Sequence, residues 1–353
     1  MKVLYVLPPD VPKLERDESR LYVFKVAALL SRQGVEVFML LPADMKVPEM
    51  PGLRTYRWSH SSRADVLRPV LRETRPAVVQ VENCPWLVPE VRQAFPGRVL
   101  LNLHSLEPLS GDAISRRALR LSLCLVDQVV LSSFFLKNLF IGRYYGLRLR
   151  VTVVYPGVDG SVFRPADTDR FLLRERQKQR LLWAVKPDET LALLAASPGD
   201  KGRELLLRCR ATAALSRLKL LVVGSAPLLS PAEVTAVEAL SPEHYRAADL
   251  FLYPAQERAA DGRFCLPAMA TALPIVAGLR GSVPEIVGPQ AGHYIRQFAD
   301  VCAWANGLGV VVPSAGLRQT MAQAGIVRSR AFTWERTARD FLQLYSRGHL
   351  SLG

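Results

Sequence analysis

Residues 253–288, YPAQERAADGRFCLPAMATALPIVAGLRGSVPEIVG, begin at the end of one strand-like run and contain a second, and each run leads through a loop into the start of a helix. The first run ends at Tyr253, and its loop leads to a small-residue helix over residues 267–272. The second run, residues 275–277, leads through a Gly-Ser turn into another helix. Helix N-termini beside strand ends present backbone N–H groups to anions. The stretch therefore predicts a binding site for an anionic ligand.

The same alternation of apolar runs and helical stretches fills the rest of the chain. The runs are continuously apolar, which is typical of strands buried on both faces of a parallel sheet. This pattern predicts doubly wound α/β domains. The predicted strands are residues 3–7, 35–41, 77–81, 99–104, 128–132, 151–155, 190–196, 218–223, 250–253 and 274–277.

With 353 residues, the chain is long enough for two such domains in tandem, with a cleft at the carboxyl ends of their strands. The stretch 166–185 is polar and highly charged, which predicts a linker. The linker would separate an α/β domain over residues 1–165 from a second one over residues 186–332. A terminal helix is predicted within residues 333–353, with Thr333 as its N-cap.

Composition favours a globular protein of the cytoplasm. Hydrophobic residues make up 49% of the chain, yet no apolar run approaches the roughly 20 residues that cross a bilayer. The N-terminal apolar stretch is too short for a signal peptide and is interpreted as the first strand. The five cysteines are widely spaced and odd in number, which favours free thiols over disulfides or a metal site.

A formal net charge of +14 indicates an anionic partner or a solvated basic face. Basic side chains group on predicted helices around Arg117 and Lys178, without the interleaved aromatic residues that bind single-stranded nucleic acid. We therefore expect no nucleic-acid partner. A weak peripheral contact with an anionic membrane and a merely solvated surface both remain open.

Four segments, in this order and at this spacing, are similar to one enzyme family. The segments are VTVVYPGVDGSVFRP at residues 151–165, DKG at residues 200–202, the quoted stretch through its PEIV, and FTWE at residues 332–335. Together they resemble family 4 (group 1) glycosyltransferases, including members named as spore coat proteins. The resemblance implies the GT-B fold, in which two tandem doubly wound domains face each other across a cleft. It also implies that the terminal helix packs back on the N-terminal domain.

The resemblance implies a nucleotide diphosphate sugar as donor, with a UDP-sugar as the expected form. The second domain would bind this donor, and the first would hold a glycan or lipid-linked acceptor, without a cofactor or metal. Lys201, at a helix start, would bind the departing diphosphate as a fixed cation. His104, at the end of a strand, would face the transferred sugar. A solvated lysine and a satisfied loop histidine are the alternatives.

Further donor-binding candidates lie on the loops of the quoted stretch. Their side chains are carboxylates, hydroxyls or the glycines of tight turns, the groups that contact ribose and phosphate. Glu285 could equally cap its helix. The candidates are Glu257, Asp261, Gly262, Gly281, Ser282 and Glu285.

The chain departs from the family pattern at the donor site. Ala196 stands where the family has an arginine, and Ala259 and Pro267 stand where it has a pair of glutamates. The turn after the first strand, residues 8–12, is PPDVP rather than glycine-rich, so it lacks N–H donors for a phosphate.

Two functions therefore compete. The first is a retaining glycosyltransferase that moves a hexose onto a cell-envelope or surface glycan. The second is a catalytically degenerate GT-B scaffold that acts as a structural or assembly protein, for example of a spore coat.

Overall fold

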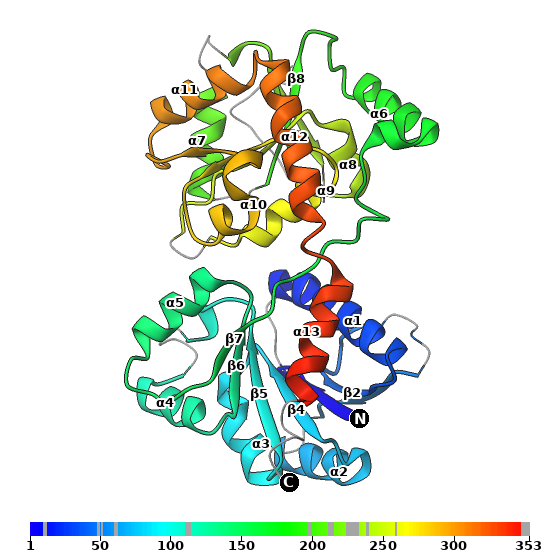
Figure 1. The fold of residues 1–353 in the computed structure, drawn as a ribbon, viewed down its shortest axis with the longest axis vertical. Helices are drawn as coiled ribbons and strands as arrows, with labels where there is room; N and C mark the ends of the chain where they lie inside the picture. The colour runs from blue at the N-terminus through cyan, green and yellow to red at the C-terminus, as the bar shows by residue number, and fades with distance from the viewer. Residues whose placement is uncertain are drawn as a thin grey trace. The chain divides into compact units, whose positions relative to one another are not determined.

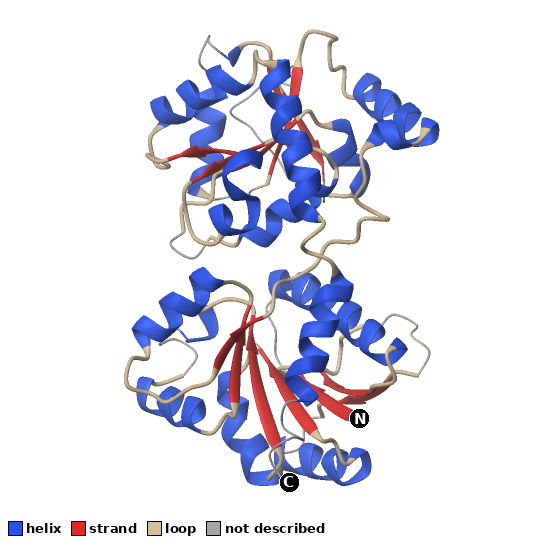
Figure 2. Ribbon diagram, in the orientation of Figure 1, coloured by secondary structure: helices blue, strands red, loops and turns tan. Residues whose placement is uncertain are grey.

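The computed structural model describes residues 1–9, 13–47, 50, 52–59, 63–109, 114–195, 200–210, 215–223, 233–237, 240–257 and 260–346. The chain forms two compact units (Figure 1). Unit 1 comprises Met1–Pro156 together with Trp334–Gly353, and unit 2 comprises Gly157–Thr333. Each unit has a sheet covered by helices (Figure 2).

The sheet of unit 1 has seven parallel strands in the order β3-β2-β1-β4-β5-β6-β7. The order reverses between β1 and β4, as in a doubly wound sheet. The strands are β1 (Lys2–Val6), β2 (Glu36–Leu41), β3 (Arg54–Arg57), β4 (Val78–Glu82), β5 (Arg98–Leu103), β6 (Gln128–Leu131) and β7 (Val151–Val153).

The helices of unit 1 cover both faces of its sheet. Helix α1 packs against α13 on one face, whereas α2 packs on α3, and α3 on α4. The right-handed crossovers that parallel strands require explain this division. The helices are α1 (Lys13–Arg32), α2 (Arg63–Thr74), α3 (Val88–Ala94), α4 (Arg116–Cys124), α5 (Phe134–Arg143) and α13 (Trp334–Ser346), with 3-10 turns η1 (Pro85–Leu87) and η2 (Glu107–Leu109).

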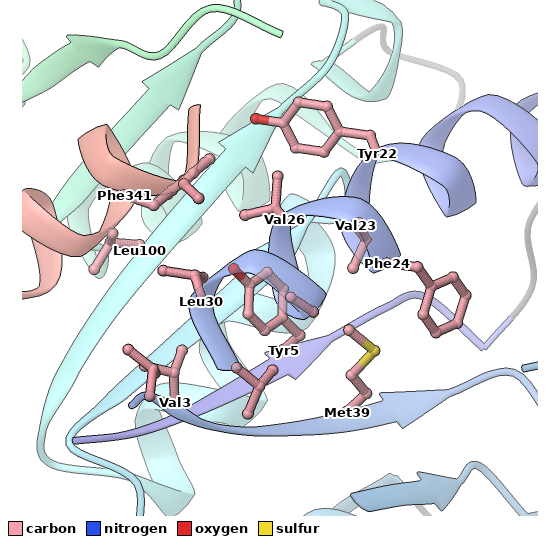
Figure 3. Packing of buried hydrophobic residues seen from close by; sticks show 14 of the residues in the cluster. Val3, Tyr5, Tyr22, Val23, Phe24, Val26, Leu30, Met39, Leu100 and Phe341 are labelled. Atoms are coloured by element: carbon pink, nitrogen blue, oxygen red, sulfur yellow. The ribbon is translucent and has the colours of Figure 1, made fainter. Parts of the chain in front are cut away.

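The terminal helix α13 completes the core of unit 1. Its Phe341 and Tyr345 are buried with Val26 and Leu30 of α1 and with Tyr5 of β1 (Figure 3). The Tyr345 hydroxyl lies 2.8 Å from the hydroxyl of Tyr5. The apolar side chains of the terminal helix therefore form one wall of the unit 1 core.

The sheet of unit 2 has six parallel strands in the order β10-β9-β8-β11-β12-β13, which reverses between β8 and β11. The strands are β8 (Thr190–Leu194), β9 (Leu218–Val223), β10 (Val234–Val237), β11 (Leu250–Tyr253), β12 (Ile275–Gly278) and β13 (Gly292–Ile295). The helices are α6 (Arg170–Leu182), α7 (Lys201–Arg210), α8 (Pro242–Ala247), α9 (Leu266–Ala270), α10 (Val283–Ala291), α11 (Val301–Val311) and α12 (Ala315–Ser329), with 3-10 turns η3 (Ala166–Thr168) and η5 (Gly262–Cys265). The predicted pair of doubly wound parallel-sheet domains is confirmed.

The charged stretch predicted as a linker is a helix of unit 2. Asp169 caps α6, and the helix packs on α8. Arg176 and Arg180 reach the Asp249 carboxylate at 2.5 and 2.7 Å, and Glu175 pairs with Arg246 at 2.8 Å. The charges of α6 pair with Arg246 of α8 and with Asp249, between α8 and β11, instead of forming a solvated tether. The change of unit falls earlier in the sequence, between Pro156 and Gly157.

Among the described helices, none combines the length and the apolar character that spanning a bilayer requires.

Candidate functional site

The candidate donor site lies at the carboxyl edge of the unit 2 sheet, defined as the edge where its parallel strands end. Ligands of doubly wound sheets bind at this edge, next to the strands between which the order reverses. In unit 2 these strands are β8 and β11. Helix α7 begins at Lys201 after β8, and the stretch quoted from the sequence begins at the end of β11.

Lys201 begins a capped helix at this edge. The Asp200 carboxylate accepts hydrogen bonds from the backbone N–H groups of Gly202 and Arg203 at 2.7 and 3.3 Å. A Cβ at Gly202 would overlap the Pro254 carbonyl, so only glycine lets α7 approach the end of β11 this closely. The Lys201 side chain is exposed. The fold therefore holds a solvent-facing ammonium at a helix N-terminus, where the helix dipole also favours anions.

The structure brings Gly262, Gly281 and Ser282 together, but it uses them to join two loops. The Ser282 hydroxyl accepts from the Gly262 N–H at 2.8 Å, and the Ser282 N–H donates to the Ala260 carbonyl at 2.9 Å. Gly281 has a φ of +56°, and a Cβ there would overlap Ala260. Ser282 is buried, and its N–H and hydroxyl both bind the chain itself. These residues set the shape of the edge, and the start of α10 offers fewer free N–H donors than the sequence predicts.

The predicted acidic residues have different environments. Asp261 caps η5 through the Arg263 N–H, and its other carboxylate oxygen lies 2.9 Å from the Arg263 guanidinium. Glu257 is exposed on the loop after β11. Glu285 is half-buried in the first turn of α10, and its carbonyl accepts from Arg328 at 2.7 Å. Of the three carboxylates, the Asp261 carboxylate is neutralised within its own loop.

A second cation, Arg280, lies at this edge, and the sequence analysis missed it. Its guanidinium stacks on the Phe298 ring, 4.1 Å from the centroid, and donates to the Gln256 carbonyl at 3.4 Å. Gly202 touches Pro254 of the same segment. Arg280 and the start of the Lys201 helix thus border residues 254–256. No local motif indicates this, because the contacts join separate loops.

Two of the three departures from the family pattern, Ala196 and Ala259, lie outside the described residues. Pro267 lies in the first turn of α9. Backbone N–H groups of the first turn have no partner within a helix, so a proline there costs no helical hydrogen bond. Tyr253, beside this helix, is buried, and burial raises the pKa of its hydroxyl well above the usual value.

In unit 1, His104 follows β5 and is buried. Its Nε2 lies 3.0 Å from the Glu82 carboxylate at the end of β4. Its backbone N–H donates to the Asn83 side chain at 3.2 Å, and the Tyr22 ring packs edge-on at 4.6 Å between centroids. Two contacts therefore hold the His104 ring, and a third holds its backbone. Glu82 was not singled out from the sequence, because it lies 22 residues before His104.

The segment after β1 begins as the sequence predicts, with prolines in place of glycines. The Leu7 N–H donates to Leu40, and the Leu7 carbonyl accepts from the Trp58 indole at 2.7 Å. Pro8 and Pro9 follow, and residues 10–12 lie outside the described part. Within the described parts of the chain, no three His, Cys, Asp or Glu side chains are arranged to hold a metal ion.

The chain is similar in sequence to several curated proteins, two of which differ in how much of the chain they cover. It is 29% identical over 231 residues to the D-inositol 3-phosphate glycosyltransferase of Salinispora tropica, an alignment that covers 58% of the chain and 48% of the relative. It is 22% identical over 365 residues to spore coat protein SA of Bacillus subtilis, with 96% of each chain covered. The chain thus spans about half the length of the first relative and nearly all of the second. No protein-family model matches the chain.

Solved structures share the whole architecture. A glycosyltransferase from Rickettsia africae superposes with a TM-score of 0.80 at 15% identity, covering 99% of both chains. The chain is similar in sequence to glycosyltransferases and has the GT-B fold. The GT-B fold is also shared with HepE of Anabaena, solved with UDP-glucose, with a TM-score of 0.74, 16% identity and coverage of 98% and 100%. HepE itself therefore binds a nucleotide sugar on this fold.

Proposed function

We propose that the chain is a retaining hexosyltransferase of the family 4 type. It transfers a hexose from a nucleotide diphosphate sugar, with UDP-sugar as the expected donor, to a cell-envelope or surface glycan. The observation that carries the proposal is Lys201, an exposed cation on a capped helix at the reversal point of the unit 2 sheet. A departing diphosphate gains negative charge, and a fixed cation stabilises that charge without rearranging.

Lys201 and Arg280 together would bind the diphosphate, and His104 would contact the transferred hexose. Glu257 and Glu285 remain candidates for donor hydroxyls, while Gly262, Gly281 and Ser282 shape the loops around them. Asp261 is a weaker candidate because it pairs with Arg263 at 2.9 Å. No cofactor or metal is part of the proposed reaction.

A screen of UDP-, GDP- and ADP-sugars for hydrolysis and transfer tests this function. Calorimetric titration with UDP gives a readout that does not require the acceptor to be known. Saturable UDP binding with turnover of one donor supports the transferase. Failure of every donor to bind would contradict it.

The competing function is a GT-B scaffold without catalysis. Spore coat protein SA, which aligns over 96% of the chain, and the three departures at the donor site favour this alternative. The same titration separates the two functions, because a scaffold that has lost its ligand binds neither UDP nor a UDP-sugar.

In our proposal, Arg280 supplies the positive charge of the family arginine, whose position Ala196 occupies in this chain. We expect Arg280→Ala to weaken UDP binding about 10- to 100-fold, because a hydrogen bond to a charged group contributes about 1.5–3 kcal/mol. Calorimetry measures the change. Arg174→Ala, on the exposed surface of α6, removes the same charge elsewhere in unit 2 and should leave the affinity unchanged. Equal losses in both variants would indicate a general charge effect.

We also propose that the protein is cytoplasmic and that unit 1 contacts an anionic membrane peripherally. Between residues 114 and 158 the only acidic residue is Asp127, which pairs with Arg92 at 2.6 Å. Large hydrophobic side chains are exposed along α5 and just after its end. Phe134 and Ile141 on the helix are 52% and 44% exposed, and Tyr145, two residues after the helix, is 88% exposed. Apolar side chains beside arginines fit the interface of an anionic bilayer. The basic residues of this segment are Arg116, Arg117, Arg120, Lys137, Arg143, Arg148 and Arg150.

Replacing Arg116, Arg117 and Arg120 together by Gln should weaken binding to phosphatidylglycerol vesicles about 100-fold, since each basic residue near such a surface contributes about 1 kcal/mol. Vesicle sedimentation at low salt measures the affinity. The matched control replaces Arg170, Arg174 and Lys178, exposed on α6, by Gln. Equal weakening by both triple variants would show that net charge, not the surface around α4 and α5, determines binding.

A further inference from the structure

A chain of buried polar side chains runs through unit 1 from α13 to His104. The Tyr345 hydroxyl lies 2.8 Å from the Tyr5 hydroxyl and donates to Gln80 Oε1 at 2.6 Å. Gln80 Nε2 donates to Glu82 Oε1 at 2.5 Å, and Glu82 Oε2 lies 3.0 Å from His104 Nε2. All five side chains are buried, so water does not compete with these bonds.

The hydrogen bonds of this series all donate in one direction, from Tyr345 towards Glu82. Gln80 accepts at its oxygen from Tyr345, which leaves its nitrogen to face Glu82. If the Gln80 amide were flipped, its oxygen would lie 2.5 Å from a carboxylate oxygen of Glu82. Two acceptors would then face each other with no proton between them. Asn102 Nδ2 donates to Glu82 Oε2 as well, at 3.0 Å. Two amide N–H donors therefore point at Glu82 before His104 is considered.

A carboxylate that collects N–H donors is an acceptor at every contact. The bond between Glu82 and His104 needs one proton, and we place it on the imidazole, because both carboxylate oxygens of Glu82 already accept from amide N–H groups. His104 Nε2 is thus protonated and donates to Glu82. In the neutral ring, Nδ1 is then an acceptor with a free lone pair.

We infer that Glu82 is a positioning residue, which fixes His104 as the Nε2–H tautomer and reserves Nδ1 as the acceptor for a hydroxyl group of the substrate. Among the side chains that the structure describes, none hydrogen-bonds Nδ1. The part of the inference that concerns the substrate rests on the proposed function, in which His104 contacts the hexose. The assignment of the tautomer does not depend on the proposed function.

The opposite arrangement would serve a different ligand. A ring with the proton on Nδ1 would donate, and would select an acceptor such as a phosphate oxygen. With Glu82 on Nε2, the ring accepts, and sugar hydroxyls are abundant donors. Helix α13 contributes to this choice of tautomer, because its Tyr345 hydroxyl orients the Gln80 amide, which in turn donates to Glu82.

The tautomer can be measured without any substrate. In protein labelled with 15N-histidine, long-range 1H–15N spectra distinguish a protonated from a bare ring nitrogen, and loss of the signal in His104→Gln assigns it. We expect the neutral ring of wild-type His104 to be entirely the Nε2–H tautomer. Glu82→Gln should give a mixture of both tautomers. A protonated Nδ1 with a bare Nε2 in the wild-type protein would overturn the inference, even if Glu82→Gln does not fold.

The same spectra contain an internal control. His244 accepts the Ser241 N–H at its Nδ1, 3.0 Å away, and burial lowers its pKa, so it should remain the neutral Nε2–H form in every variant. Tyr5→Phe is the matched variant within the chain, because it removes a hydroxyl that touches neither Glu82 nor His104. We expect Tyr5→Phe to leave the His104 signals unchanged; a tautomer change as large as in Glu82→Gln would assign the effect to general loosening of the core.

Kinetics then connect the tautomer to the reaction. With an active donor, Glu82→Gln should lower kcat/KM about 10- to 100-fold, by analogy with the loss seen when a partner that orients a metal-bound histidine is removed. In a His104→Ala background the same substitution should cause no further loss, since Glu82 acts through His104. Full additivity would contradict the positioning role. A fixed tautomer in a protein that turns over no donor would leave this assignment standing and reject the proposed function instead.

Discussion

Lys201→Ala should lower turnover of the nucleotide-sugar donor by about 10²- to 10³-fold, which corresponds to a loss of about 2.7–4 kcal/mol of transition-state stabilisation. The charge on the diphosphate grows as the bond to the sugar breaks, so the cation contributes more in the transition state than in the ground state. The affinity for UDP should fall as well, since UDP carries the same charge. Initial rates and calorimetry measure the two effects separately.

Two control variants separate the effect of the charge on Lys201 from the effect of its position. Lys178→Ala removes an exposed lysine from α6 and should leave the rate unchanged. Lys201→Arg keeps the positive charge at the start of α7 and should retain part of the activity. A Lys201→Ala protein that binds UDP as tightly as wild type would remove Lys201 from the site, and with it the observation on which the transferase proposal depends.

Phe341→Ala should lower the free energy of unfolding of unit 1 by about 3–5 kcal/mol. Phe341 is fully buried in the unit 1 core, where α13 packs against α1, and truncation leaves a cavity there. Hydrogen exchange read by peptide is the suitable measurement, because two units need not unfold together. Exchange should accelerate in β1, β4 and α13 and stay constant in unit 2.

Phe171→Ala is the matched control, because Phe171 on α6 is 71% exposed. The same atoms are removed, but little packing is lost, so we expect a change within about 0.5 kcal/mol. Uniform acceleration of exchange across both units in Phe341→Ala would contradict the assignment of α13 to unit 1.

The interior strands of both sheets could be predicted from the sequence, and so could the edge strand β7, whereas the other edge strands could not. Strands such as β11 and β12 are continuously apolar because helices cover both faces, and this pattern is visible in the sequence. The edge strands β3, β10 and β13 have four residues each and are only partly buried, so their composition carries no such signal. Their pairing depends on the neighbouring strand.

The predicted linker failed for a related reason. A run of charged residues has the same composition whether its side chains are solvated or paired with other segments of the fold. The partners of α6 lie far away in the sequence, since Asp249 follows Arg176 by 73 positions. Only the fold brings them together, and charge alone could not distinguish a tether from a docked helix.

The candidate site was predictable where it depends on local motifs. Lys201 at a helix start and the turn at Gly281 follow from the sequence, and both lie at the carboxyl edge of unit 2. The contributions of Arg280 and Glu82 depend on contacts between separate segments, with Gln256 and His104 as their partners. The free N–H groups expected at the start of α10 were overestimated, because Ser282 binds Ala260 across the loops.

Helix α13 has a consequence for biosynthesis. A ribosome releases the first 156 residues of unit 1 long before it makes the helix that closes their core, with the whole of unit 2 translated in between. Until then the face of α1 that α13 covers is left bare, although its apolar side chains have already been made. The nascent chain must therefore keep that face from aggregating, and the early half of the protein reaches its native packing only when the late helix arrives.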